Sequence, residues 1–292
     1  MPLETGEFEG LRPYLTAIAY RMLGSRAEAE DAVQEAWLRW ARQDDVRDAK
    51  GWLTTVTGRI CLDQLQSARV RRTAYPGQWL PSYVVDPDAD PAGQVERADQ
   101  VSVALLVVLE RLTPEQRVAF VLHDAFGVPF DEVAAVLGTT PAAARQHASR
   151  GRRAVAEGGM RHTAGLAEQK RVLTAFLSAA QSGDMRALAA VLAPDVVAIG
   201  DSGGTARTAL NPVRGAEKVG RFYHGLLSYR FSELTDVKVD PVLVAGSAAV
   251  MLRGVQADGR TLTVVLTVAV DGGRITGLFS QQNPAKLVLG DL

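Results

Sequence analysis

The densest group of side chains that could bind another molecule lies between residues 141 and 157. Four arginines, a glutamine and a serine recur there at helical spacing and fill a wide stripe on one side of the expected helix. They are Arg145, Gln146, Ser149, Arg150, Arg152 and Arg153. Arginine binds phosphate and guanine, and glutamine and serine can bond to base edges, so this stripe is typical of a helix in the major groove of DNA. The alternative is a three-helix unit whose charged face is only solvated.

Three helices must position that stripe. Thr113, Pro114 and Gln116 have the form of a capping box, which opens a helix that should end near Gly127. The spacing then predicts a short helix over 130–137, a turn at Gly138 and a third helix over 141–157. Small apolar residues line the side of the third helix that faces away from the arginines, namely Ala144, Ala148 and Val155. This arrangement fits a helix-turn-helix.

A second basic group could also contact DNA. It ends a helix expected from about residue 51 and contains Arg69, Arg71 and Arg72. Leu53 and Ile60 share the buried stripe of that helix, which leaves Arg59 on the outside. Basic residues at a helix C-terminus also suit the helix dipole without any ligand, and this alternative stays open. The net charge of the chain is −1, so any DNA binding must depend on the two short basic patches.

A third surface is suited to protein docking. Ser25 and Glu28 predict a capped helix from Arg26 to about Arg42. Its apolar face contains Ala29, Val33, Ala36, Trp37 and Trp40, and its opposite face contains Asp31, Gln34, Glu35 and Leu38. A leucine among charged residues indicates a docking surface, although a stray leucine on a solvated face is a common alternative.

Two of these segments resemble regions of the extracytoplasmic-function group of bacterial sigma factors. Residues 29–38, AEDAVQEAWL, are similar to the AEDxxQExxL signature of sigma region 2. Residues 130–138 and the helix after them are similar to sigma region 4. The resemblance implies that core RNA polymerase and promoter DNA are the partners. It implies that the polymerase is contacted by Asp31, Gln34, Glu35 and Leu38.

The same resemblance assigns the DNA-reading residues. The segment over 52–63, with the arginines after it, is similar to the part of region 2 that holds the unstacked strand of the minus-10 element by aromatic stacking and cationic contacts. It implies DNA contacts by Trp52, Arg59, Arg69, Arg71 and Arg72. Most members of the wider family have asparagine where Arg59 stands, which leaves the base preference open. The likeness to region 4 implies that the arginine stripe over 145–153 reads the minus-35 element.

Residues 75–97 differ in composition from the helical blocks on either side. Four prolines and three aspartates lie between residues 76 and 91, so we expect a linker without a helix or a core. The GQWLP motif at residues 77–81 places Trp79 in this stretch, and an exposed aromatic residue usually docks on another surface. Local collapse onto the first helical block is the alternative.

The pattern changes after residue 158 to that of an α+β domain. Helices are predicted over 166–182, 185–192 and around 217–227, and strands over 196–199, 237–244, 248–255, 262–270 and 275–280. Asp-Gly pairs at 258–259 and 271–272 predict tight turns between the last strands. Residues 165–285 look like a SnoaL-like domain, which curves a sheet around a pocket.

Sigma factors that carry such an extension have three further motifs, and this chain has an imperfect form of each. They are a WLPEP-like motif, with Ser82-Tyr83 in place of Glu-Pro, a DGGG-like motif and a terminal NPDK-like motif. The residues concerned are Trp79, Leu80, Pro81, Asp201, Gly203, Gly204, Asn283, Pro284 and Lys286. Their order implies that the extension regulates the sigma regions in cis.

Some relatives with the SnoaL-like fold are enzymes, so side chains that could act as an acid or base need an explanation. They are Asp201, Tyr223 and His224. Asp201 precedes a glycine-rich turn and is better explained by supporting it. His123 and His147 have no partner at metal-ligand spacing. We therefore expect no catalytic residue, no metal and no cofactor. The alternative is a DNA-binding sensor whose C-terminal domain binds or transforms a small molecule.

The expected fold class is a multidomain protein with two all-α sigma domains, the second a helix-turn-helix, followed by an α+β SnoaL-like cone domain. The expected bounds are 1–74 for sigma region 2, 75–97 for the linker, 98–158 for region 4 and 165–285 for the cone. The chain has no long uncharged apolar stretch, no secretory leader and one cysteine, Cys61, which we expect to be buried. We therefore expect a cytoplasmic protein that does not bind membranes and is a monomer when free.

Overall fold

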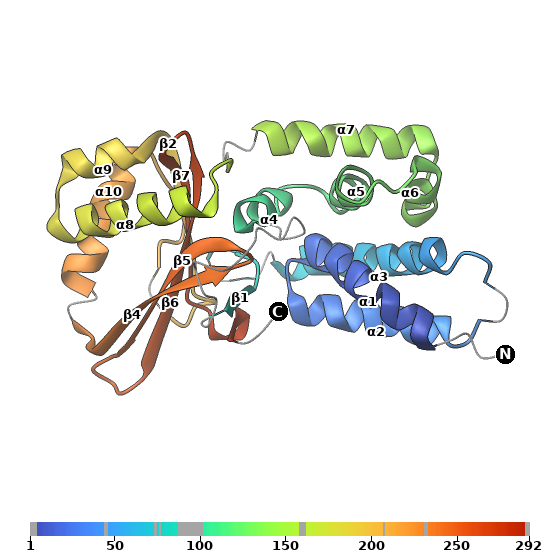
Figure 1. The fold of residues 1–292 in the computed structure, drawn as a ribbon, viewed down its shortest axis with the longest axis horizontal. Coiled ribbons are helices and arrows are strands. Elements are labelled where there is room, and N and C mark those ends of the chain that lie inside the picture. The colour runs from blue at the N-terminus through green and yellow to red at the C-terminus, as the bar shows by residue number, and fades with distance from the viewer. Residues whose placement is uncertain are drawn as a thin grey trace. The chain divides into compact units, whose positions relative to one another are not determined.

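The computed structural model describes residues 5–43, 46–72, 75, 77–86, 102–157, 162–206, 208–230 and 233–289. The chain divides into two units (Figure 1). Unit 1 contains residues 1–74 and 108–157, and unit 2 contains residues 75–107 and 158–292. The chain therefore passes from one unit to the other at residues 74–75, 107–108 and 157–158. The short helix α4 (Val103–Leu109) lies across the second of these points.

The first half of unit 1 contains α1 (Thr5–Leu23), α2 (Arg26–Trp40) and α3 (Ala49–Arg72). The hydroxyl of Ser25 accepts a hydrogen bond from the N–H of Glu28 at 3.4 Å, so α2 begins where the capping residue predicts. Its buried face consists of Ala29, Ala32, Val33, Ala36 and Trp40. Because alanine dominates this face, α1 and α3 pack closely against α2. The side chain of Cys61 in α3 is buried, as predicted.

The second half of unit 1 contains α5 (Pro114–Ala119), the π-helical segment η1 (Phe120–Ala125), α6 (Phe130–Leu137) and α7 (Pro141–Glu157). Thr113 and Gln116 form the predicted capping box in both directions, with hydrogen bonds of 3.2 and 3.3 Å. The single helix expected as far as Gly127 widens after Ala119 into η1, a change that the apolar spacing does not reveal. Gly138, with a φ of +62°, ends α6 and turns the chain into α7.

α7 packs against α5 through its smallest residues. Ala144, Ala148 and Gly151 are buried, whereas Val155 at the end of the predicted stripe is only half-buried. A Cβ atom on Gly151 would lie 3.1 Å from the carbonyl oxygen of Gln116, so glycine permits the close approach of the two helices. The helix-turn-helix therefore keeps its arginine stripe on the outside.

In the described part of unit 2, eight strands form one sheet in the order β3-β2-β7-β6-β5-β4-β1-β8. The strands are β1 (Tyr83–Asp86), β2 (Leu192–Asp201), β3 (Val213–Arg214), β4 (Thr235–Val244), β5 (Ser247–Val255), β6 (Thr261–Asp271), β7 (Arg274–Gln281) and β8 (Leu287–Leu289). The helices are α8 (Leu166–Ser182), α9 (Met185–Val191), α10 (Ala216–Gly225), the π-helical η2 (Leu226–Arg230) and the 3-10 turn η4 (Pro284–Lys286).

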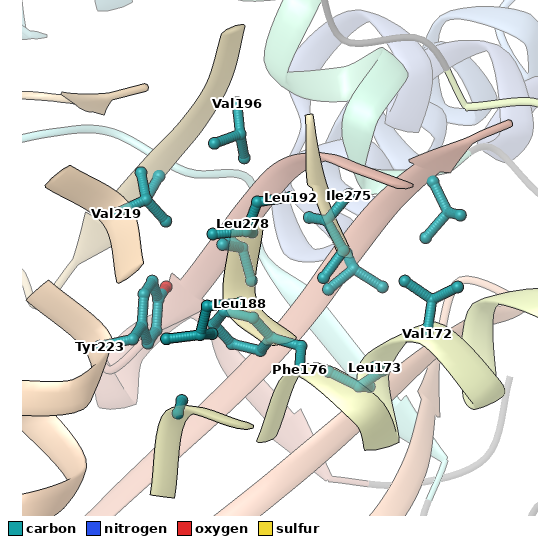
Figure 2. Packing of buried hydrophobic residues seen from close by; sticks show 14 of the residues in the cluster. Val172, Leu173, Phe176, Leu188, Leu192, Val196, Val219, Tyr223, Ile275 and Leu278 are labelled. Carbon is teal, nitrogen blue, oxygen red and sulfur yellow. The ribbon is translucent and has the colours of Figure 1, made fainter. Parts of the chain in front are cut away.

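The core of unit 2 lies between α8, α9 and α10 and one face of the sheet. Val172 and Phe176 of α8 and Leu188 of α9 pack with apolar side chains from β2, β6 and β7 (Figure 2). The rings of Phe176 and Tyr223 meet edge to face with their centroids 5.2 Å apart. This α+β architecture agrees with the predicted class of the C-terminal domain.

The linker contributes strand β1 to this sheet, which differs from the expectation that residues 75–97 bury no core. Val85 pairs antiparallel with Val244 of β4, and Tyr83 pairs parallel with Leu287 of β8. Tyr83 and Val85 are fully buried. The sequence Tyr-Val-Val consists of strong strand formers, but both of its pairing partners come from the far end of the chain, so the local pattern does not reveal the strand.

Candidate functional site

Helix α2 presents the residues predicted to dock on a partner protein. Asp31, Gln34, Glu35 and Leu38 are all exposed, and 51 % of the Leu38 surface is accessible. Glu35 forms an ion pair with Arg39 one turn later. Because the alanine face of α2 is buried, the opposite face keeps a leucine between acidic and amide side chains.

Helix α3 carries five of the residues predicted to contact DNA, and the side chains of two of them, Trp52 and Arg59, make contacts within unit 1. The ring of Trp52 packs against the ring of Trp40, with centroids 5.6 Å apart. The guanidinium of Arg59 donates two hydrogen bonds to the carbonyl oxygen of Ala135 in α6, at 2.8 and 3.3 Å. The side chains of the other three predicted residues, Arg69, Arg71 and Arg72, lie outside the described residues.

The contact between α3 and α6 is close because a glycine lies at its centre. A Cβ atom on Gly58 would lie 3.0 Å from Cγ1 of Val136 and 3.6 Å from Cδ1 of Leu122. Further along α3, the amide of Gln66 donates a hydrogen bond to Glu115 at 3.4 Å. Helices α5 and α6 thus both lie directly on α3, the helix predicted to read the minus-10 element.

Arg117 ties the two halves of unit 1 together from a buried position. It is 2 % exposed and donates hydrogen bonds to the carbonyl oxygens of Met22 and Leu109, at 2.8 and 2.9 Å. It also forms an ion pair with Glu110 at 2.8 Å. Sequence reasoning missed this residue, because an isolated arginine at helical spacing is usually solvated.

Helix α7 exposes the whole predicted stripe. All six residues are exposed, namely Arg145, Gln146, Ser149, Arg150, Arg152 and Arg153. The guanidinium of Arg145 lies 5.2 Å from the centre of the Phe130 ring, and Arg152 pairs with Asp124 at 2.7 Å. Ion pairs at a surface contribute little to stability, so these contacts can be exchanged for contacts with a phosphate backbone.

The three imperfect motifs of the sequence meet at one buried carboxylate in unit 2. Asp201, at the end of β2, is fully buried. One of its oxygens accepts from the hydroxyl of Tyr75 at 2.6 Å and the N–H of Gly203 at 3.0 Å. The other accepts from the N–H of Leu80 at 2.9 Å and the ammonium of Lys286 at 2.7 Å. The linker, the turn after β2 and the C-terminal motif therefore converge on a single side chain.

Lys286 completes the same cluster. Its side chain is 8 % exposed, and its ammonium also donates to the carbonyl oxygen of Leu80 at 3.0 Å. The nitrogen lies 3.0 Å from the centre of the Trp79 ring and 4.6 Å from that of Tyr75. A buried ammonium needs both charge and hydrogen-bond partners, and here an anion, a carbonyl and two aromatic faces supply them.

Asn283 joins the terminal motif to the glycine turn. Its side-chain amide donates a hydrogen bond to the hydroxyl of Tyr75 at 2.9 Å. Its side-chain oxygen Oδ1 accepts one from the N–H of Ala285 and so caps the start of η4. Gly203 has a φ of +58°, and a Cβ atom there would lie 2.5 Å from Nδ2 of Asn283. Gly204 and Pro284 are exposed at the two turns. We call the group formed by Tyr75, Trp79, Leu80, Asp201, Asn283 and Lys286 the clasp.

Two residues of this region were not singled out by the sequence. Tyr75 is the first residue of the linker, and Gln281 donates a hydrogen bond to the carbonyl oxygen of Pro81 at 3.1 Å. Burial, and then the hydrogen bond and charge of Asp201, raise the pKa of Tyr75 above its ordinary value. A tyrosine next to a proline-rich stretch gave no signal by spacing, because its hydrogen-bond partners, Asp201 and Asn283, lie more than a hundred residues away.

The side chains considered for acid or base chemistry are engaged in separate contacts. Asp201 is held in the clasp, and His224 shares a hydrogen bond with the carbonyl oxygen of Ala180 at 3.0 Å. Burial raises the pKa of Tyr223, so its phenol is neutral at pH 7. Within the described ranges, no cluster of three or more histidine, cysteine or acidic side chains could hold a metal ion. None of the described helices is long and apolar enough to cross a membrane.

Known proteins match this chain along its length. Residues 8–71 match the family model for Sigma-70 region 2, residues 102–155 match Sigma-70 region 4, and residues 173–278 match the SnoaL-like domain. The chain is 45 % identical over 291 residues to the ECF RNA polymerase sigma factor SigJ of Mycobacterium tuberculosis (strain ATCC 25618 / H37Rv), covering 97 % of this chain and 93 % of that protein.

Two further comparisons agree with these. The chain is 36 % identical over 280 residues to the probable ECF RNA polymerase sigma factor SigI of Mycobacterium tuberculosis (strain CDC 1551 / Oshkosh), covering 94 % of this chain and 92 % of that protein. The crystal structure of the Mycobacterium tuberculosis extracytoplasmic function sigma factor SigJ superposes with a TM-score of 0.75 at 41 % identity. That match covers 97 % of this chain and 98 % of the crystallised one.

Proposed function

Because this chain belongs to the extracytoplasmic-function (ECF) sigma factors of RNA polymerase, we propose that its C-terminal SnoaL-like domain restrains promoter recognition in cis by holding the linker between regions 2 and 4. Sigma factors act by binding core RNA polymerase and promoter DNA. The proposal assigns polymerase binding to α2, DNA reading to α3 and α7, and the restraint to the clasp.

The polymerase surface rests on the exposed face of α2. A half-exposed leucine surrounded by Asp31, Gln34 and Glu35 suits a partner helix that offers an apolar groove with basic edges. Leu38→Asp should therefore weaken binding to core polymerase by about tenfold or more without unfolding the protein. Met185→Asp is a matched control, because Met185 is also partly exposed but lies in the C-terminal domain. Equal affinities of the two variants in a pull-down titration would count against this surface.

The DNA surfaces rest on α7 and on the end of α3. The stripe from Arg145 to Arg153 offers fixed cationic and hydrogen-bonding groups on a single helix face, as major-groove reading requires. Trp52, Arg59, Arg69, Arg71 and Arg72 lie on one helix, where stacking and backbone contacts to a single strand are the expected chemistry.

The packing of unit 1 is the observation that supports restraint. The minus-10 and minus-35 elements lie roughly 25 base pairs apart, which is about 80 Å along B-DNA. In unit 1, by contrast, α3 and α6 are in van der Waals contact at Gly58 and Val136. Arg59, which is assigned to DNA, instead binds the carbonyl oxygen of Ala135. A protein in this arrangement cannot read both elements at once, so the two regions must separate before initiation.

The clasp acts on the segment that would have to move. Leu80 and strand β1 belong to the stretch between α3 and α4, and they are bound to the C-terminal domain by Asp201, Lys286 and the strands on either side of β1. Holding this connection keeps regions 2 and 4 from separating. The ion pair of Lys286 with Asp201, both of them buried, is the contact on which this restraint depends most directly.

Run-off transcription with core RNA polymerase on a randomised promoter library tests both parts of the proposal. Proteins ending before Asn283 or near Met160, and the Lys286→Met variant, should give more promoter-dependent transcript than the full chain. Lys218→Met, at an exposed lysine of α10, is the matched control and should behave like the full chain. No promoter-dependent transcript from any form would contradict the assigned promoter reading, whereas equal transcript from all forms would contradict restraint by the clasp.

A further inference from the structure

Unit 2 contains an apolar cavity that neither the clasp nor the sigma regions use. It has a volume of about 410 Å³, within the range of small-molecule sites, and lies between α8, the end of α10 and strands β4 to β7. Most of its wall is leucine and valine from α8, η2 and strands β4 to β6, among them Leu177, Leu226, Val239, Val250 and Leu266.

Three polar side chains define a buried inner end and an exposed outer end of the cavity. Tyr223 and Ser280 are nearly fully buried and hydrogen-bonded to each other, so they mark the inner end. Gln181 is exposed and marks the outer end, together with the partly exposed Val237 and Val239. The ring of Tyr223 is held by Phe176 and Phe222, and Figure 2 shows it packed beside Leu188 and Val219 of the core. Its hydroxyl is therefore a fixed group at the bottom of an apolar space.

The lining defines the chemistry of an occupant. Among the described residues that line the cavity, none carries a charge, so a charged ligand would lose its hydration without compensation. The described lining also contains no carboxylate and no imidazole, and Tyr223 stays a neutral phenol because burial raises its pKa. The cavity is therefore suited to binding a molecule rather than to acid–base turnover.

We propose that this cavity binds a neutral, mostly apolar small molecule whose ketone or hydroxyl oxygen lies at Tyr223 and Ser280. The assignment does not depend on the clasp acting as a restraint. The cavity is nevertheless close to the linker. Ser280 lies in β7 between Phe279 and Gln281, and both of these residues contact the linker. The carbonyl oxygen of Phe279 accepts from the hydroxyl of Tyr83 at 3.4 Å, and Gln281 donates to Pro81.

A fluorescent ketone tests the proposal on the full chain. 6-Propionyl-2-dimethylaminonaphthalene is neutral and apolar, carries one ketone and changes its emission on leaving water. It should bind saturably at one site per chain with a blue-shifted emission. Val239→Trp fills the outer part of the cavity and should weaken binding by at least about tenfold. Lys238→Trp, at the next residue of β4 and on the opposite face of the strand, is the matched control and should bind like the unmodified chain.

The polar end is tested by a pair of probes. Tyr223→Phe removes one hydroxyl with little change in volume. It should weaken the affinity for the ketone probe by about three- to tenfold, which is the contribution of one hydrogen bond. N-phenyl-1-naphthylamine, which is neutral but has no carbonyl group, should bind Tyr223→Phe and the unmodified chain equally. An anionic anilinonaphthalene sulfonate should bind more weakly than both neutral probes.

Three results would overturn the proposal. One is equal binding of the ketone by Val239→Trp and Lys238→Trp, which would place the probe elsewhere. Another is tighter binding of the sulfonate than of the neutral probes. The third is a dimer in sedimentation velocity that Val239→Trp dissociates, since a second copy of the chain would then cover the cavity instead of a small molecule.

Discussion

Asp201 and Lys286 illustrate how a single buried pair can fix the position of a distant segment. Removing a carboxylate and an ammonium from water is costly, and the cost is offset only if further partners satisfy the remaining lone pairs and protons. Tyr75, Leu80 and Gly203 satisfy Asp201, while the carbonyl oxygen of Leu80 and the Trp79 ring satisfy Lys286. Such a pair contributes mainly to specificity, because no other position of the linker supplies these partners.

Loss of one member of the pair should loosen the linker markedly. In Lys286→Met the carboxylate of Asp201 stays buried without its counter-charge, so docking of the linker should weaken by about 3 kcal/mol. The N–H of Leu80 donates directly to Asp201, and its rate of hydrogen exchange therefore reports the loss. The double variant Asp201→Leu, Lys286→Met should lose less than the sum of the two single changes. Strict additivity would mean that the two side chains do not act together.

Tyr75 should make linker docking sensitive to alkaline pH. Its pKa is raised in the clasp, so the undocked chain releases the phenolic proton at a lower pH than the docked chain does. Docking is then at full strength below the ordinary tyrosine pKa of about 10 and weakens as the pH rises above that value. Protection of the Leu80 N–H from hydrogen exchange should fall with rising pH in this way in the unmodified chain. The fall should be smaller in Tyr75→Phe. An identical pH profile for both would exclude Tyr75 as the titrating group.

At the scale of elements, the contact between α3 and α6 depends on one missing side chain. Gly58→Leu places a branched side chain where a Cβ atom alone would already lie 3.0 Å from Val136. Leucine favours helix more than glycine does, so α3 itself should remain helical while α6 is pushed away. We expect faster proteolysis between α5 and α7 and more promoter-dependent transcript from the full chain.

Gly10→Leu provides the control for this change. Gly10 is also in a helix, α1, and its added Cβ would have no heavy atom within 4 Å. It should gain the same helix propensity without affecting α6. If Gly10→Leu and Gly58→Leu raise transcription equally, the effect does not come from the contact between α3 and α6.

The elements that were predictable are those whose determinants are local. Ser25 and Thr113 cap α2 and α5 through residues three positions later, and Gly138 ends α6 by its own left-handed φ. The exposed stripe of α7 follows from spacing alone. β1 was not predictable, because its four residues gain their partners from β4 and β8. The relatedness to ECF sigma factors and to SnoaL-like domains, drawn from short motifs, is confirmed by the comparisons.

The same distinction applies to the candidate site. The motif residues were identifiable one by one, but their meeting at Asp201 was not, since the motifs lie in three separate parts of the chain. Arg59 is predicted to contact DNA, and its hydrogen bond to the carbonyl oxygen of Ala135 was not predictable, because only the tertiary packing of α3 on α6 creates it. Tyr75 and Arg117 carry no spacing signal, because each gains its role by burial.

At the scale of the whole molecule, the proposed restraint requires that the linker be released before regions 2 and 4 move apart. The chain from Arg72 to Ser102 spans at most roughly 100 Å when fully extended, which is enough for the roughly 80 Å between the promoter elements. Under the proposed restraint, the contacts of Leu80 with Asp201 and Lys286 and the pairing of β1 with β4 and β8 remove this freedom.

The separation can be measured with two dyes in unit 1. Cysteines placed at the exposed positions Asp63 of α3 and Glu157 of α7 can be labelled selectively, because Cys61 is buried and burial raises the pKa of its thiol. Energy transfer should be high in the free chain and largely lost in the complex with core polymerase and promoter DNA. Lys286→Met should lower the energy transfer even in the free chain. Unchanged transfer on complex formation would show that regions 2 and 4 stay together during initiation.

The chain order of the clasp also sets when it can form. Tyr75, Trp79 and Leu80 are made early, whereas Asn283 and Lys286 are made more than two hundred residues later. Helix α7 ends at Glu157, and at roughly 5–20 residues per second the ribosome needs about 6–26 s more to reach Lys286. During that interval both promoter-reading regions exist and the clasp does not. The proposed restraint is therefore absent from each newly synthesised chain at first, and under this proposal polymerase near the ribosome meets the unrestrained form first.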